Sequence, residues 1–223
     1  MRGVGACIIA GVFVSPFAKG SDVVSCHQDS GRQLARSEEL QRIVGADQAD
    51  RKDQDRFFRD AKFRNRVLLR DLERRKRVGE IFGEGCFKEA RDFAASALVY
   101  QHGDIPEHFF QAFIWSKRAI DLGADSQKEL MGKALDRYLV NIGQRQLIAT
   151  QATKAMGAKC WCLEQVEATF PDERRLANGH RSLSQALDWI SELNKDEPSC
   201  SEPKPCEDKA LKPTPSGFVP GFW

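Results

Sequence analysis

The chain has 223 residues, which is enough for one folded domain with a sizeable hydrophobic core and additional tails. Hydrophobic residues make up 41% and charged residues 30%, as is ordinary for a soluble globular protein. The net charge is +2, and Arg2 and Lys19 supply two positive charges, so the chain beyond its first twenty residues is neutral. This balance excludes a general electrostatic attraction to nucleic acid or to an anionic membrane, and we expect no nucleic-acid partner.

The first twenty residues, MRGVGACIIAGVFVSPFAKG, combine a basic start, an apolar centre and the small-x-small sequence Ala18-Lys19-Gly20. This pattern predicts a secretory signal peptide over residues 1–20 and a secreted or periplasmic protein. The apolar stretch is short for a membrane span, so we expect no transmembrane segment in the mature chain. The alternative is a cytoplasmic protein whose apolar N-terminal helix packs on the domain.

Residues 21–33 are polar and lack periodicity, which predicts a disordered N-terminal segment. They include VVSC, ending at Cys26, which loosely fits a lipoprotein cleavage site. Beyond the first twenty residues there are six cysteines, an even number that permits disulfides in an exported chain. Their spacing does not fix the pairing, although Cys200 and Cys206 are the easiest pair to close. Cys160-Trp161-Cys162 is not the Cys-x-x-Cys pattern of a redox or zinc site.

Four helical segments follow. Residues 34–76 have a charged helical pattern, which Gly45 is expected to interrupt and GEIFGEG to end. Residues 87–102, 105–122 and 127–142 have apolar stripes at helical spacing, and the last two end at Gly123 and Gly143. The short connections predict antiparallel neighbours.

LIATQATKAMGAKCWCLEQV alternates loosely and predicts a β-hairpin with strands at about 147–154 and 159–166. A helical pattern resumes in FPDERRLANGHRSLSQALDWISELN. The expected fold is therefore mainly α: a compact antiparallel helical bundle of about five or six helices with a small β-hairpin at about 147–166, in a domain over residues 34–195.

Residues 196–223 hold six of the nine prolines, which predicts a C-terminal tail that is dispensable for folding. The tail ends in GFVPGFW. This aromatic end is expected to dock on its own domain or on a partner, or to be exposed.

The order of several motifs resembles a family of uncharacterised bacterial proteins catalogued as a domain of unknown function. The motifs are ALVYQHGD, ALDRYLVNIGQRQLIATQ and CLEQVEATFPDERR, and the resemblance covers about residues 55–193. The family pattern has Gln-His-Ala-Asp, Asp-Arg, Tyr-Gly-Thr-Gln, Pro-Ile-Glu and Asp-Glu-Arg-Arg. This chain departs from it at Gly103, at Ile148-Ala149 and at Cys162-Leu163. The resemblance implies a common fold and site location but no reaction.

His102, Asp104 and His108 lie close enough in sequence to suggest a metal site, a catalytic site or the junction between two helices. Asp104 stands three residues before Glu107, which predicts a capping box at the start of a helix. Capping accounts for Asp104, and a fourth ligand is not indicated, so we expect no metal and no cofactor.

The candidate ligand site is expected where helix ends meet the hairpin. His102 and Asp136 lie near the ends of two parallel helices, and the hairpin starts just after the second of them. The candidate residues are Gln101, His102, Asp136, Arg137, Gln146, Gln151 and Glu164. The alternative is a purely structural role, in which these residues form a polar network that joins the hairpin to the helices and His102 is a structural histidine.

Nucleophile-elbow, phosphate-loop and Rossmann motifs are missing from the sequence, and no catalytic residue is assigned. The favoured hypothesis is an exported binding or interaction protein for an unknown small molecule or protein. The alternative is a hydrolase-like enzyme that uses His102 with Asp136 or Glu164.

Overall fold

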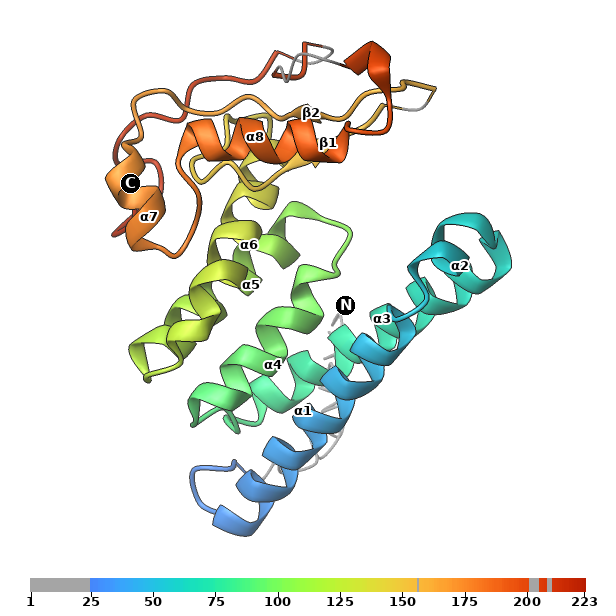
Figure 1. Ribbon diagram of the computed structural model, residues 1–223. Helices are drawn as coiled ribbons and strands as arrows, with labels where there is room; N and C mark the ends of the chain where they lie inside the picture. Colours follow the sequence, from blue (N-terminus) through green and yellow to red (C-terminus); the bar gives the residue numbers. More distant parts are fainter. Residues whose placement is uncertain (1–24, 156, 201–204, 208–209) are drawn as a thin grey trace, which may run out of the picture.

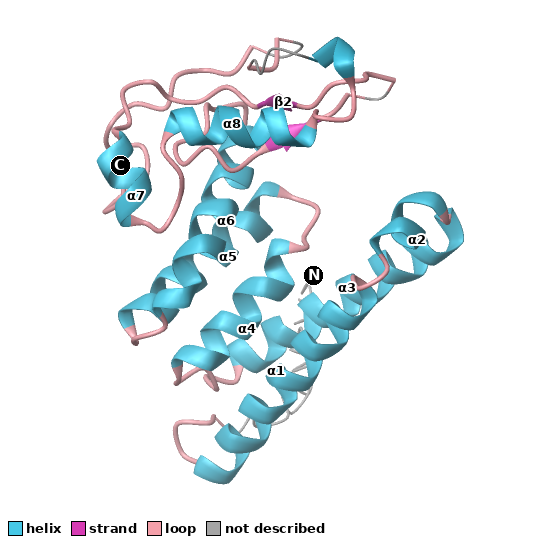
Figure 2. Cartoon of the chain, viewed as in Figure 1, coloured by secondary structure: helices cyan, strands magenta, loops and turns pink. Residues whose placement is uncertain are grey.

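The computed structural model describes residues 25–155, 157–200, 205–207 and 210–223, so the predicted signal peptide lies outside the described residues. Within them the chain forms eight α-helices, two short 3-10 helices and one two-stranded antiparallel sheet (Figures 1 and 2). The predicted mainly α fold with a small hairpin is confirmed.

Three antiparallel helices form the centre of the bundle: α4 (Ala90–Gln101), α5 (Pro106–Asp121) and α6 (Lys128–Asn141). Their bounds agree with the apolar stripes to within a few residues. Gly123 and Gly143, the predicted stops, have φ of +98° and +79°, a left-handed conformation that ends a helix and favours glycine.

The N-terminal helices are longer than the sequence predicts. Helix α1 (Ser30–Asp50) continues through Gly45, whose missing side chain faces open space, so the glycine removes no contact. After the short α2 (Gln54–Arg59), helix α3 (Ala61–Gly83) continues through the first glycine of GEIFGEG. It does so because Val78 and Ile81 are fully buried in the bundle. Helix α2 and the start of α3 project from the bundle as an arm (Figure 1).

A second layer lies across the end of the central helices (Figure 2). It contains the hairpin, with β1 (Ala152–Thr153) paired to β2 (Cys162–Leu163), and helices α7 (Asp172–Ala177) and α8 (Leu183–Leu193). The strands are much shorter than predicted. The last helical pattern is divided in two because Gly179 has a φ of +74°. The 3-10 helices are η1 (Asp125–Gln127) and η2 (Pro198–Cys200).

The prediction of disorder in residues 21–33 is wrong for its described part. Cys26 is fully buried and bonded to Cys86, and Asp29 caps α1 by accepting a hydrogen bond from the backbone N–H of Arg32. The disulfide also excludes a lipid thioether on the same Cys26 sulfur. The segment lacks helical periodicity because the disulfide, rather than an apolar stripe, fixes it.

The C-terminus packs on its own domain, which argues against the prediction that the tail is dispensable for folding. Val219 is buried in the cluster formed by α5 and α6, and the rings of Phe222 and Trp223 contact the same cluster. The Trp223 indole N–H donates to the carbonyl oxygen of Thr214 at 2.9 Å. The high proline content correctly predicted that the described part of the tail has little regular secondary structure. It does not predict whether the tail packs on the domain.

Two further disulfides attach this tail to the hairpin. Cys160 is bonded to Cys200, and Cys162 to Cys206. The expected Cys200–Cys206 pair is therefore wrong. That pair was expected because two cysteines close in sequence form the shortest loop. In the structure the tail runs beside the second strand instead, and the Cys206 N–H donates to the Leu163 carbonyl oxygen.

Candidate functional site

His102 lies at the C-terminal cap of α4 and is held by an aspartate that sequence reasoning missed. Its Nδ1 atom lies 2.9 Å from Oδ2 and 3.2 Å from Oδ1 of Asp47, near the end of α1. Asp47 is completely buried. The two residues are 55 positions apart, and no local pattern connects them.

Asp47 belongs to an ionic cluster that joins α1 to α3. Arg51 donates to Asp47 at 2.9 Å and to Asp71 at 2.7 Å, and Arg74 pairs with Asp71 at 2.9 Å and with Asp50. Each charge in this cluster has an opposite charge beside it. The aspartates therefore neutralise these arginines. Much of the positive charge in the sequence RDLERRKR of α3 is balanced by acidic residues of α1.

Asp104 does not cap helix α5, contrary to the sequence prediction. The capping position is Ile105, with Pro106 as the first helical residue. Asp104 instead pairs with Arg75 at 3.2 Å and with His108 at 3.1 Å. The helix starts one residue later than the capping-box spacing predicts, because proline already suits the first turn.

Asp136 is fully buried and accepts four hydrogen bonds of 2.9 Å. The donors are the backbone N–H groups of Leu147, Ile148 and Thr150, and the Thr150 hydroxyl. Burial raises the pKa of the Asp136 carboxyl, and the four donors oppose this shift. Both oxygens are engaged in holding the loop before β1, where Ala149 has a φ of +69°. Asp136 is therefore a structural anchor.

The side chain of Gln146 joins the two halves of the hairpin by hydrogen bonds. Its Nε2 atom donates to the backbone carbonyl oxygens of Gln151, at 3.0 Å, and Glu164, at 2.7 Å. Its Oε1 atom accepts from the Gln151 N–H at 2.8 Å. The polar-network alternative describes these residues correctly.

Arg137 differs from the other candidates because it faces the bundle without an opposite charge. It donates to the backbone carbonyl oxygen of Gln101 at 2.8 Å and to Oε1 of Gln151 at 3.4 Å. Its guanidinium carbon lies 5.5 Å from the centre of the Phe109 ring. In the described part of the chain no carboxylate pairs with it. Burial lowers the pKa of Arg137, which reflects the cost of keeping this charge away from water.

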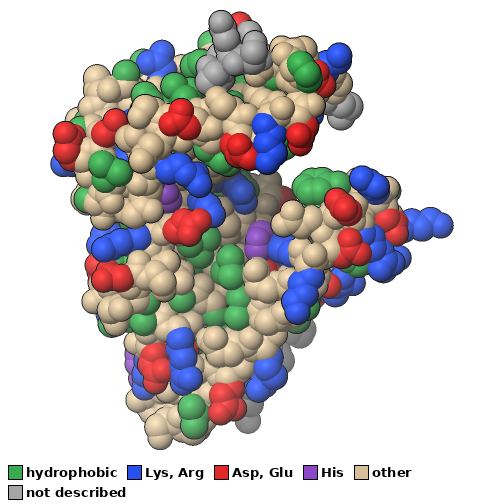
Figure 3. Space-filling view, viewed as in Figure 1, with side chains coloured by type: hydrophobic (Ala, Val, Ile, Leu, Met, Phe, Trp, Pro, Cys, Tyr) green, Lys and Arg blue, Asp and Glu red, His purple; other side chains and the backbone are tan. Residues whose placement is uncertain are grey.

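A hollow of about 500 Å³ opens where His102 and Arg137 approach the arm. Its polar lining comes from the ionic cluster and the helix ends, and its apolar lining comes from the arm. The lining residues are Arg51, Gln54, Phe57, Phe58, Leu68, Asp71, His102, Gly103 and Arg137. Figure 3 shows the depression between the arm and the α8 layer, with charged and histidine side chains inside it.

The predicted residues thus converge only in part. Arg137 connects Gln101 to Gln151, and Gln146 connects Gln151 to Glu164. Asp136 points into the hairpin loop. His102 shares the hollow with Arg137 but takes its carboxylate partner from α1. Sequence reasoning missed the α1 cluster and the arm phenylalanines, and the alternating charges of α1 and α3 were the only signal for the cluster.

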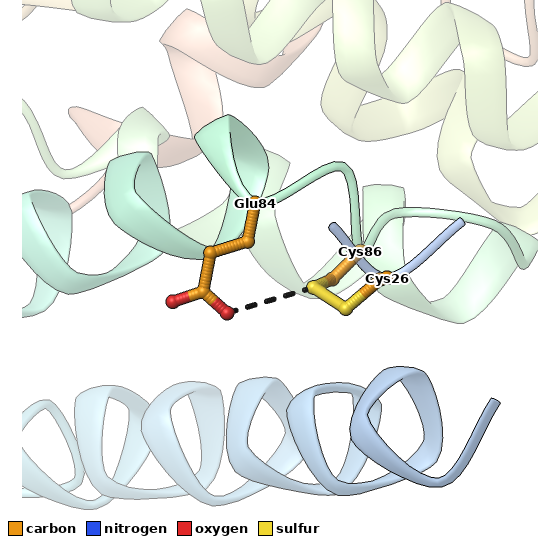
Figure 4. A group of neighbouring side chains, drawn as sticks. All are labelled: Cys26, Glu84 and Cys86. Carbon is orange, nitrogen blue, oxygen red and sulfur yellow. Dashed lines mark hydrogen bonds between the residues drawn. A yellow bond between two sulfur atoms is a disulfide. The ribbon is translucent and has the colours of Figure 1, made fainter. Parts of the chain in front are cut away.

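Cys26, Glu84 and Cys86 form the one group of potential metal ligands among the described residues. Figure 4 shows that the cysteines are joined as a disulfide beside Glu84, whose Oε2 lies 3.7 Å from the Cys86 sulfur. Arg32 and Arg36 pair with the same carboxylate at 3.0 and 2.8 Å. Oxidised sulfurs and a neutralised carboxylate make this group unsuitable for a cation.

No protein-family model, curated protein or solved structure matches this chain. Among the described helices, none combines the length and the apolar character needed to cross a membrane. The resemblance to the family of unknown function stays a prediction.

Proposed function

We propose that this chain is an exported binding protein whose ligand is a small anion with an apolar part, held in the hollow beside His102. The observation that carries the proposal is Arg137, a largely buried cation that lines the hollow without a carboxylate partner in the described residues. A carboxylate or phosphate ligand would supply the missing charge and accept a charge-assisted hydrogen bond.

The arm supplies the apolar side of the proposed site. Phe57, Phe58 and Leu68 line the hollow, and Phe58 is 73% exposed. A ligand with an aromatic or aliphatic group would cover these side chains while its anionic group contacts Arg137. Burial of apolar area contributes about 25 cal/mol per Å², so even a ring-sized contact would add measurably to affinity.

Binding is tested by isothermal titration calorimetry with phenylpropionate and its neutral counterpart phenylpropanol. We expect the acid to bind more tightly than the alcohol, and Arg137→Gln to remove that difference. The matched control is Arg174→Gln. Arg174 also donates to a backbone carbonyl oxygen at 2.8 Å and lies 5.5 Å from an aromatic ring, but at the C-terminal end of the molecule. Equal binding of acid and alcohol by the wild-type protein would contradict the proposal.

Three disulfides support the export half of the proposal, because disulfides persist in oxidising compartments. N-terminal sequencing of the native protein should begin near Ser21. An intact Met1 on cytoplasmic protein would contradict export.

The second candidate is a hydrolase, favoured by the hydrogen bond between His102 and Asp47. This carboxylate, rather than the predicted Asp136 or Glu164, fixes Nδ1 of the imidazole as the donor and leaves Nε2 as a base. For an ester bound at Arg137, Nε2 would take a proton from water as the hydroxide attacks the carbonyl carbon. The C–O bond would then break, and the imidazolium would return the proton to the leaving alkoxide.

Turnover of p-nitrophenyl phenylpropionate tests this second candidate. The wild-type protein should release p-nitrophenol, and His102→Gln should lower the rate by about 10²-fold or more. The Arg174→Gln protein serves as the control and should retain the rate. Equal rates for the wild-type and His102→Gln proteins would reject the hydrolase and leave the binding proposal unaffected.

A further inference from the structure

A second hollow, of about 420 Å³, lies next to the first on the side of helix α6 that faces α8. Its lining includes Lys133 of α6, Thr150 of the hairpin loop, and His180, Arg181 and Trp189 from the α8 region. In Figure 3 the depression under the α8 layer contains basic, acidic and histidine side chains.

The absence of a side chain at Gly132 makes room for the floor of this second hollow. A Cβ atom on Gly132 would collide with the imidazole of His180. The Nε2 atom of His180 lies 3.1 Å from the backbone carbonyl oxygen of Lys128, so Nε2 is the donor and Nδ1 is an acceptor in the neutral ring. The space beside Gly132 is therefore taken by the His180 ring.

The carboxylate of Glu129 also lines the second hollow, and one of the two lining arginine and lysine side chains has no ion-pair partner within the described part of the chain. Lys133 is paired with Glu129 at 2.5 Å, and the two charges neutralise each other. Arg181 lies over the Trp189 ring, with 5.2 Å between its guanidinium carbon and the ring centre. In the described residues no carboxylate pairs with Arg181. Arg181 therefore lines the second hollow without an ion pair, as Arg137 lines the first, although Arg181 is exposed and Arg137 is largely buried.

Gln151 connects the two hollows directly. Its Oε1 atom accepts from Arg137 of the first hollow at 3.4 Å. Its Nε2 atom donates to the Thr150 hydroxyl at 2.9 Å and to the Lys133 carbonyl oxygen at 3.3 Å, both in residues of the second hollow. Lys133 and Arg137 are one turn apart on α6, a rise of about 6 Å. The hollows are therefore adjacent and separated by one polar side chain.

We propose that the two hollows form one extended site for an elongated small molecule with two anionic groups, one bound by Arg137 and the other by Arg181. This inference rests on the proposed function and adds the class of ligand. The linking segment of the ligand would pass over Gln151. Two separated cations discriminate between a dianion and a monoanion of the same length, which one cation does not do.

The experiment compares nonanedioate with its monomethyl ester by isothermal titration calorimetry. The wild-type protein should bind the dianion roughly tenfold more tightly, as expected for one additional charge-assisted contact. Arg181→Gln should reduce the affinity for the dianion to that for the ester and leave the affinity for the ester unchanged. The control is Arg118→Gln, since Arg118 lies over the Phe93 ring on a different part of the bundle.

The outcomes separate the two proposals. If phenylpropionate binding depends on Arg137 but nonanedioate and its ester bind equally, the extended site is wrong and the proposed function stands. If Arg181→Gln and Arg118→Gln weaken dianion binding equally, the extended site is again wrong. If none of the acids binds more tightly than its neutral counterpart, both proposals are wrong. Circular dichroism of each variant establishes that it is folded.

Discussion

The imidazole of His102 and the carboxylate of Asp47 form a hydrogen-bonded pair, with 2.9 Å between Nδ1 and Oδ2, that joins the end of α4 to the end of α1. From α3, Arg75 donates to the backbone carbonyl oxygen of the same histidine at 3.1 Å. The three helices therefore meet at His102. The same contacts fix one wall of the first hollow, so stability and the proposed binding site depend on one polar junction.

We expect Asp47→Ala to lower the free energy of unfolding by about 3–5 kcal/mol, because it removes a fully buried carboxylate, leaves the His102 Nδ1–H donor without its acceptor and leaves Arg51 with Asp71 alone. Asp121→Ala is the matched control. Asp121 also pairs with a basic residue four positions away on its helix, but its side chain is 46% exposed, and the expected loss is at most about 0.5 kcal/mol. Urea denaturation measures both. Similar losses for the two variants would show that the cluster contributes little.

The disulfide between the hairpin and the tail should stabilise the fold strongly. Cys162 and Cys206 close a loop with a sequence separation of 44, for which chain entropy predicts about 4 kcal/mol. We expect the Cys162→Ser/Cys206→Ser variant to have a free energy of unfolding lower by about this amount. Its midpoint of urea denaturation should therefore lie at a lower urea concentration. Mass mapping of the unreduced wild-type protein provides the second measurement, and a linked Cys200–Cys206 peptide would contradict the pairing.

The C-terminal aromatic residues should contribute to folding. Trp223 contacts the Phe170 ring, with 5.0 Å between ring centres, and donates a hydrogen bond to Thr214. Trp223→Ala should cost about 2–4 kcal/mol and lower the melting temperature by roughly 5–10 °C. Phe218→Ala is the control in the same segment, because Phe218 is 38% exposed, and its expected effect is below about 1 kcal/mol. A normal melting temperature for Trp223→Ala would show that the docked end is dispensable after all.

The central helices could be predicted because their information is local. Apolar stripes and the glycines at 123 and 143 define α5 and α6 without reference to the rest of the chain. Gly45 misled the prediction because tertiary packing of α1 outweighs a helix penalty of about 1 kcal/mol. The strands were predicted too long, because the pattern does not show how few backbone hydrogen bonds join them. Two disulfides to the tail hold the hairpin in addition to those few bonds.

The site could be predicted only where neighbouring elements build it. Arg137 and Gln151 meet because the hairpin starts just after α6, and that topology is visible in the sequence. The pairing of His102 with Asp47 is not visible, because it depends on how α1 packs beside α4. The arm that closes the first hollow was predicted as a helix, but its direction depends on the turns around α2.

The buried His180 should make stability fall in mildly acidic solution. Burial lowers the pKa of His180 below the ordinary value of 6.5, so the unfolded chain binds a proton at a higher pH than the folded protein does. Its contribution is fully present above the unfolded value and is lost as the pH falls from about 6.5 toward the lower folded value. Glu129 stands beside it, and Lys133 lowers the pKa of that carboxyl, so Glu129 titrates below this range.

The free energy of unfolding should therefore decrease between about pH 7 and pH 5 by up to about 1.4 kcal/mol per pH unit for His180. His108 adds to the slope, because burial lowers its pKa too. We expect His180→Gln to reduce the slope while keeping a donor for the Lys128 carbonyl oxygen. His27→Gln, which removes a histidine at an exposed position, is the control. Urea denaturation at several pH values provides the measurement, and equal slopes for wild type and His180→Gln would show that His180 does not titrate differently on unfolding.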